Sequence, residues 1–175
     1  QDRSSAASDV YKRQVLGLGL LGASICAAAK KLGLASEIIG ISRRQSTIEI
    51  AHAKEIIDKS SDSLATLAGN FGEDDLLVLA VPTLAMKSVL SECQEHVPPS
   101  VTITDVASVK TKIIEFAEQA YSGIPKNFVP GNPIAGSEKS GINAANPDLF
   151  KNHKVVLTPK EMTSQGHINL SLIHI

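Results

Sequence analysis

The sequence predicts one α/β domain in which a mostly parallel β-sheet is covered by helices on both faces. Three observations lead to this fold class. From residue 15 onward, short apolar runs alternate with longer helical stretches, which is typical of right-handed βαβ units. A glycine-rich turn separates the first apolar run from the first helix. The chain has 175 residues, 43% of them hydrophobic, which is enough for one domain with a core but not for two.

The first candidate strand holds Val15 and Leu16 together with the residues before them. Those residues, 11–14, read Tyr-Lys-Arg-Gln, although a first strand that is buried on both faces is expected to be apolar. Five further apolar runs are candidate strands: residues 37–42, 76–81, 101–105, 127–130 and 153–158.

Four stretches between these strands are candidate helices, and several carry start or stop signals. Gly33 suits the left-handed position after the end of the first helix. Ser46 and Glu49 have the spacing of a capping box, which predicts a helix start at Ser46. Pro98 and Pro99 stop the third helix. The predicted helices are residues 20–32, a helix that begins at residue 46, residues 83–96 and residues 109–121.

The folded domain is expected to occupy residues 10–160. The polar segment 1–9 and the tail 165–175 show no clear pattern, so they are expected to be non-native or disordered. Residues 131–150 are rich in Gly, Pro, Asn and Ser, which predicts a long loop. Loops at the carboxyl ends of parallel strands carry function in this architecture, so this loop is the candidate substrate edge.

Residues 17–22, Gly-Leu-Gly-Leu-Leu-Gly, have the spacing of a dinucleotide-binding turn. Gly17 permits the tight turn, Gly19 lets a pyrophosphate approach backbone N–H groups, and Gly22 allows the helix to pack closely on the strand. The motif alone is weak and also arises by chance, but here it follows an apolar run and opens a helix. We therefore predict a Rossmann-like domain that binds a nicotinamide cofactor, with Leu20 and Leu21 also at the cofactor.

The end of the second strand indicates which cofactor is bound. An acidic residue normally holds the ribose there when the cofactor lacks a 2′-phosphate, but this chain has Ser42, followed by Arg43 and Arg44. Guanidinium groups beside a small hydroxyl residue suit a 2′-phosphate, which favours NADP over NAD. The alternative is that both arginines are merely solvated on a surface loop.

Two later strand ends are expected at the nicotinamide side of the cofactor. Val81 and Pro82 close the strand at 76–81, where the chain of such a domain passes near the nicotinamide ribose. Asp105 closes the next strand, so Ser108 and Lys110 just after it are predicted to point toward the same cofactor crevice. The alternative is that Asp105 or Ser108 only caps the helix that follows.

Composition excludes several other functions. Lys and Arg total 17 against 18 for Asp and Glu, so no excess of positive charge favours nucleic acid or an anionic membrane, and the expected ligand is small. The longest apolar stretch is too short to span a bilayer. Cys26 and Cys93 form no CxxC pair, which predicts reduced thiols in a cytoplasmic protein. The histidines lack metal-ligand spacing, so no metal is expected.

Several segments carry a resemblance to a known family. They read Gly-Leu-Gly-Leu-Leu-Gly at 17–22, Leu-Ala-Val-Pro at 79–82, Thr-Asp-Val-Ala-Ser-Val-Lys at 104–110 and Pro-Ile-Ala-Gly-Ser-Glu-Lys-Ser-Gly at 133–141. Together with residues 148–150 and 156–159, they resemble prephenate dehydrogenase. The likeness runs in order from about residue 15 to residue 159, and the segment Ala-Gly-Ser-Glu-Lys-Ser-Gly is far more specific than the glycine turn.

The resemblance implies NAD(P)-dependent oxidative decarboxylation of prephenate, or of the related arogenate, in tyrosine biosynthesis. It implies that Ser108 and a histidine just before Pro133 contact the ring hydroxyl, and that Glu138, with Ser137 beside it, lies at the substrate edge. This chain has Asn132 at the histidine position. Asparagine has no titratable nitrogen that accepts a proton near neutral pH, so the chemistry at this catalytic position is expected to be impaired.

The resemblance also implies a helical C-terminal domain that forms a homodimer and completes the substrate pocket. Nothing after residue 159 resembles that domain, so we expect a truncated chain that keeps the cofactor site, with a homodimer only in the full-length protein. Two other functions stay open: a non-catalytic nucleotide-binding fragment or degenerate paralogue, and a dehydrogenase of the hydroxyacid or imine-reductase type. The 133–141 segment argues against the latter, while prephenate and arogenate remain equal alternatives.

Overall fold

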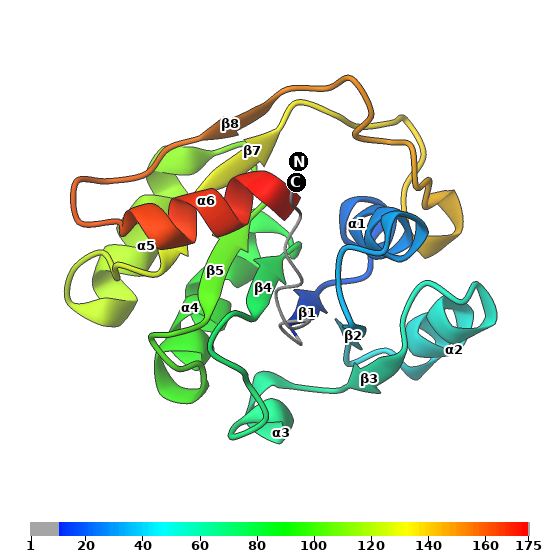
Figure 1. The fold of residues 1–175 in the computed structure, drawn as a ribbon, viewed down its shortest axis with the longest axis horizontal. Coiled ribbons are helices and arrows are strands. Elements are labelled where there is room, and N and C mark those ends of the chain that lie inside the picture. The colour runs from blue at the N-terminus through cyan, green and yellow to red at the C-terminus, as the bar shows by residue number, and fades with distance from the viewer. Residues whose placement is uncertain (1–10, 175) are drawn as a thin grey trace, which may run out of the picture.

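A six-stranded parallel sheet forms the centre of the computed structural model, which describes residues 11–174 (Figure 1). The strands lie in the order β3-β2-β1-β4-β5-β6, so the chain winds outward from the centre in both directions. This is the predicted Rossmann-like class, with its switch point between β1 and β4. The strands are β1 (Lys12–Leu16), β2 (Glu37–Ile41), β3 (Lys59–Ser61), β4 (Leu76–Leu79), β5 (Thr102–Asp105) and β6 (Phe128–Val129).

Helices cover both faces of this sheet, as predicted (Figure 1). The first helix has the predicted bounds, and Gly33 follows it with a φ of 62°, the left-handed conformation expected there. The first two helices in the chain cover one face, and the next three cover the other. They are α1 (Leu20–Leu32) and α2 (Gln45–Ala53) on the first face, and α3 (Leu64–Leu67), α4 (Met86–His96) and α5 (Lys110–Tyr121) on the second.

Strand β4 shows why the sheet is apolar throughout. Leu76 and Val78 belong to the core cluster beneath α1 and α2, whereas Leu77 and Leu79 belong to the cluster beneath α4 and α5. Side chains alternate between the two faces of a strand, and both faces here are covered, so every position of β4 is apolar.

Strand β1 departs from this rule, because its polar residues are part of the strand. It pairs with β2 on one side and with β4 on the other, and Arg13 and Gln14 are each 1% exposed. Arg13 donates to the carbonyl oxygen of Leu34 at 2.9 Å, and Gln14 donates to the carboxylate of Asp75 at 2.7 Å. The strand therefore forms in spite of its composition, and hydrogen bonds partly compensate for burying the polar groups.

The segment after β6 corrects two predictions. Residues 131–133 start a strand, β7 (Gly131–Pro133), so the predicted loop at 131–150 is not loop throughout. The predicted strand at 153–158 is present as β8 (Val155–Leu157), but it pairs antiparallel with β7 in a separate two-stranded sheet and does not extend the parallel one. Between them lies the short 3₁₀ turn η2 (Ile142–Ala144).

Two helix starts also differ from prediction. Helix α2 begins at Gln45, its N-cap residue is Arg44, and no side chain caps it, so the predicted capping box at Ser46 is wrong. The predicted helix at 83–96 is divided into the 3₁₀ turn η1 (Thr83–Ala85) and α4. Pro82 is the N-cap residue of η1, a position where the missing N–H of proline costs no helical hydrogen bond.

The tail expected to be disordered contains helix α6 (Gln165–His174). This helix packs against β5 and β6, and Thr102 Oγ1 and His167 Nδ1 lie 2.5 Å apart. Contacts with the sheet decide its conformation, because its sequence has no clear helical period. None of the helices in residues 11–174 is long and apolar enough to cross a membrane. The end segment 1–9, also expected to be non-native or disordered, lies outside the described residues.

Candidate active site

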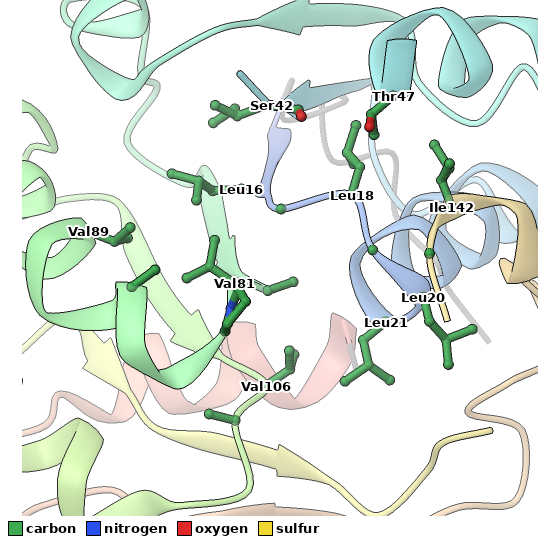
Figure 2. Close-up of a pocket in the computed structure, with 18 of the residues that line it drawn as sticks. Leu16, Leu18, Leu20, Leu21, Ser42, Thr47, Val81, Val89, Val106 and Ile142 are labelled. Atoms are coloured by element: carbon green, nitrogen blue, oxygen red, sulfur yellow. The ribbon is translucent and has the colours of Figure 1, made fainter. Parts of the chain in front are cut away.

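A cavity of about 990 Å³ lies at the carboxyl ends of the parallel strands. Its walls come from the segments that follow β1, β2, β4 and β5, together with β7 and the loop after it. Figure 2 shows Leu18 on the turn after β1, Leu20 at the start of α1, Ser42 at the end of β2, and Val81 and Val106 after β4 and β5. The cavity therefore spans the switch point, where an α/β sheet of this order binds its ligand.

The glycine turn forms the floor of this cavity. The N–H of Gly17 donates to the carbonyl oxygen of Ile41 at 3.0 Å, and its φ of 97° then turns the chain sharply out of β1. A Cβ on Gly19 would meet nothing within 4 Å, so the space beside this residue is open. Gly22 lies beneath the turn, where a Cβ would overlap the carbonyl oxygen of Gly17. The three glycines thus have the three geometries that the motif predicts.

Leu20 and Leu21, both predicted to lie at the cofactor, open helix α1 and line the cavity. The first turn of α1 contains no acidic side chain, and the N-cap residue Gly19 has no side chain to occupy the helix N-terminus. The unsatisfied N–H groups of that turn, with the positive end of the helix dipole, therefore face the cavity and suit an anion.

Ser42, Arg43 and Arg44 line the cavity at the end of β2. The Ser42 Oγ accepts the N–H of Arg44 at 3.2 Å, which fixes the serine at the start of α2. Thr47 and Asp62 line the same end, although the sequence did not single them out. Asp62 follows β3, which has three polar residues. Without an apolar run the sequence does not predict this strand, and so it does not place Asp62 at the end of one.

Val81, Pro82, Ser108 and Asn132 line the other half of the cavity, after β4, β5 and in β7. The structure therefore brings together residues that lie far apart in the sequence and that were assigned separately to cofactor and substrate. The N-cap residue of α5 is Val109, and no side chain caps it, so Ser108 is free of the capping role that was its alternative.

Lys110 does not face this crevice, contrary to the prediction. It donates to the carboxylate of Asp105 and to the carbonyl oxygen of Gly131. Burial raises the pKa of the Asp105 carboxyl above its ordinary value, and the charge of Lys110 opposes that shift. Burial likewise lowers the pKa of Lys110, and Asp105 opposes this. A buried carboxylate attracts the nearest cation, which is why Lys110 turns inward.

Ser137 and Glu138 are not among the lining residues of the cavity. Both are exposed, and the Ser137 Oγ accepts the N–H of Lys139 at 3.2 Å. Lys139 does line the cavity, as do the residues that follow it up to Ile142. The loop predicted to be the substrate edge therefore does line the cavity, but not through Ser137 or Glu138.

The loop after β7 is fastened to helix α1. The N–H of Asn146 donates to the Ser24 Oγ at 3.0 Å, and Lys31 pairs with Asp148 at 2.8 Å. Ile142 is 7% exposed and belongs to the core cluster beneath α1 and α2, and Figure 2 shows it beside Leu20. This loop thus forms a wall of the cavity opposite η1 and α4.

Residues 25–172 match the family described as "Prephenate dehydrogenase, nucleotide-binding domain". The chain belongs to this family. It is 39% identical over 145 residues to the prephenate dehydrogenase of Lactococcus lactis, and the aligned part covers 82% of this chain and 40% of that enzyme. The sequence resemblance to prephenate dehydrogenase is therefore confirmed.

Solved structures of the family support the same assignment. A prephenate dehydrogenase from A. aeolicus, in complex with hydroxyphenyl propionate and NAD+, superposes with a TM-score of 0.83 at 27% identity. The matched part covers 96% of this chain and 57% of the A. aeolicus chain. The arogenate dehydrogenase of Synechocystis has a TM-score of 0.81 at 35% identity, and the matched part covers 94% of this chain and 55% of the Synechocystis chain. This nucleotide-binding domain thus spans somewhat more than half the length of those chains.

Within residues 11–174, no group of three or more His, Cys, Asp or Glu side chains is arranged to hold a metal ion.

Proposed function

We propose that this chain binds a nicotinamide dinucleotide, with NADP preferred, as the cofactor domain of an enzyme that oxidatively decarboxylates prephenate or arogenate. The observation that carries the proposal is the cavity at the switch point, whose floor is the glycine turn. The turn fits the cofactor, because the open space over Gly19 and the unsatisfied N–H groups of α1 suit a pyrophosphate. The relatives named as dehydrogenases support the reaction.

The end of β2 supports the preference for NADP. Ser42, Arg43 and Arg44 line the cavity where the ribose of a dinucleotide lies, and no carboxylate occupies the Ser42 position. Two guanidinium groups and a hydroxyl give a 2′-phosphate several charge-assisted hydrogen bonds. Asp62 lines the same end of the cavity, and its carboxylate repels the 2′-phosphate. The attraction of the two arginines for that phosphate therefore has to exceed this repulsion.

The chemistry proposed for the other half depends on Ser108 and Asn132. A bound nicotinamide accepts the hydride that leaves the substrate ring. The hydroxyl of Ser108 and the amide of Asn132 line the cavity where they can hydrogen-bond the ring hydroxyl and orient it. Neither group takes up a proton near neutral pH, whereas a histidine at position 132 would. A rate loss of about a hundred- to ten-thousand-fold is the expected cost of a missing general base.

Asn132 also favours a second candidate function, a nucleotide-binding module without catalysis. In that case the glycine turn and the arginines still bind the dinucleotide, but no ring oxidation follows. The two functions differ in turnover and not in cofactor binding, so they need separate experiments.

The first experiment is a calorimetric titration of this chain with NADP+ and with NAD+. Saturable binding with NADP+ at least tenfold tighter is expected. Equal affinities would overturn the assignment of Ser42 and the two arginines, and the absence of binding by either cofactor would overturn the cofactor site itself.

The second experiment tests the reaction in a chimera. Residues 15–160 of this chain replace the aligned part of the L. lactis prephenate dehydrogenase, and hydride transfer from prephenate and from arogenate is followed by reduced-cofactor absorbance. We expect slow turnover without an ionisation belonging to position 132, and a rate increase of at least a hundredfold in Asn132→His. If the chimera binds the cofactor but neither form turns over either substrate, the module without catalysis is the better description.

A further inference from the structure

The carboxylate of Asp105 connects the two residues proposed to contact the substrate ring. Its Oδ2 accepts the N–H of Ala107 at 2.9 Å, and its Oδ1 accepts the N–H of Gly131 at 3.2 Å. Ala107 immediately precedes Ser108, and Gly131 immediately precedes Asn132. One side chain that is 0% exposed thus holds the backbone next to both residues.

Lys110 completes this arrangement from the first turn of α5. Its ammonium donates to Asp105 Oδ2 and to the carbonyl oxygen of Gly131, and its side chain is only 14% exposed. Gly131 is therefore held at its N–H by the carboxylate and at its C=O by the ammonium. Charge-assisted hydrogen bonds in a buried setting are short and directional, so they fix the position of the backbone more tightly than neutral ones.

Close packing at Gly131 is a second constraint on the same place. A Cβ at this position would lie 2.9 Å from the carbonyl oxygen of Asp105 and 3.2 Å from Thr104 Oγ1. Strand β7 can therefore lie against the end of β5 only because residue 131 has no side chain. The distance of Asn132 from the end of β5 is set by this contact.

We propose that the Asp105–Lys110 pair is a positioning device that fixes Ser108 and Asn132 relative to each other at the nicotinamide end of the cleft. The inference rests on the proposed function, because it assigns that half of the cavity to the reacting groups. Neither Asp105 nor Lys110 lines the cavity, so the pair acts through the backbone and not by touching the ligand.

The test compares Asp105→Asn with Asp58→Asn by NMR of the amide groups. Asp58 is a matched control, because its carboxylate also pairs with a lysine, Lys30, and accepts a backbone N–H, that of Ile38 at 2.9 Å. In the free protein we expect Asp105→Asn to shift the amide signals of Ser108 and Asn132 and to speed hydrogen exchange at Gly131 about tenfold. Asp58→Asn should leave these three amides unchanged.

The functional readout is the difference between two ligands, NADP+ and 2′-phospho-ADP-ribose, which lacks the nicotinamide. In the wild type, amide shifts at residues 17–21 and 42–44 should be common to both ligands, and shifts at Ser108 and Asn132 should appear with NADP+ alone. In Asp105→Asn, the common shifts are expected to stay, whereas the NADP+-specific shifts at Ser108 and Asn132 are expected to fall by at least half. A role in stability alone would not separate the two sets.

Two further variants keep the test decisive if Asp105→Asn does not fold. Lys110→Met removes the ammonium, and Gly131→Ala pushes β7 away from β5 without changing any charge, so both should reproduce the selective loss at Ser108 and Asn132. Wild-type shifts in all folded variants would overturn the positioning role. If the wild type binds neither ligand, the proposed function fails, and the amide signals of Ser108 and Asn132 in the free protein then decide only whether the pair holds these two residues in place.

Discussion

Gly22 packs so closely on Gly17 that a Cβ on Gly22 would overlap the carbonyl oxygen of Gly17. In the same turn, Gly19 has no atom within 4 Å of the place where its Cβ would stand. The fold requires Gly17 as well, since its φ is 97° and its Cβ would lie 2.5 Å from the carbonyl oxygen of Ala80, so Gly19 is the glycine of this motif without a packing reason.

Gly22 and Gly19 predict opposite effects of one substitution. Gly22→Ala is expected to lower the melting temperature strongly, by several degrees or more, because helix α1 must move off the turn. Gly19→Ala is expected to leave the melting temperature within about 2 °C and to weaken dinucleotide binding at least tenfold, because the methyl group occupies the pyrophosphate position. Thermal unfolding and calorimetry measure the two effects. Undiminished affinity in Gly19→Ala would place the cofactor somewhere else.

Cofactor choice is expected to invert when a carboxylate is placed at the end of β2. In Ser42→Asp, an acidic side chain accepts from the ribose 2′-hydroxyl of NAD and repels the 2′-phosphate of NADP. We expect NADP+ affinity to fall by about tenfold or more and NAD+ affinity to rise. Arg43→Ala should weaken NADP+ by roughly 10- to 100-fold with little effect on NAD+. Lys151→Ala, an exposed charge outside the cavity, is the control and should change neither affinity.

Replacing the buried arginine of β1 is expected to stabilise the fold. Arg13 is 1% exposed between two strands, and burial lowers its pKa to about 10. The guanidinium is still charged at pH 7 in both the folded and the unfolded chain, so the cost of burying it is fully present there. Arg13→Leu should raise the free energy of unfolding by roughly 1–3 kcal/mol in urea titrations. Lys12→Leu, in the same strand but less buried, should change it by less than about 0.5 kcal/mol. A destabilised Arg13→Leu would show that the polar contacts of Arg13, among them the hydrogen bond to Leu34, outweigh the burial cost.

Both cysteines are expected to be unreactive in the folded protein. Burial raises the pKa of Cys26 to about 12 and that of Cys93 further above its ordinary value. Each thiol is 0% exposed, and the two lie in core clusters on opposite faces of the sheet, so they form no disulfide. At pH 8, a thiol-specific reagent should label both cysteines at least a hundredfold faster in denaturant than in buffer. Fast labelling of one cysteine in buffer would show that its helix opens locally.

The sequence determined the class of the fold because that class depends on local patterns. Helix α1 has the bounds that its apolar period and Gly33 predict, and the apolar run at 76–81 contains strand β4. It also located the glycine turn and the residues after β2, which line one cavity in the structure. A glycine turn is a contiguous motif, and the residues after β2 follow it at a known distance, so both are readable without coordinates.

Only the tertiary structure decided the parts that depend on contacts between distant segments. Strand β1 and helix α6 form against their own composition because neighbouring strands hydrogen-bond to β1 and pack against α6. Strands β3 and β7 have three residues each, too few for a period to show. Lys110 turns away from the cleft because Asp105 is buried beside it. In the loop after β7, Lys139 lines the cavity and Glu138 does not. Burial and charge pairing across the fold are properties of three-dimensional neighbours, and a one-dimensional pattern does not contain them.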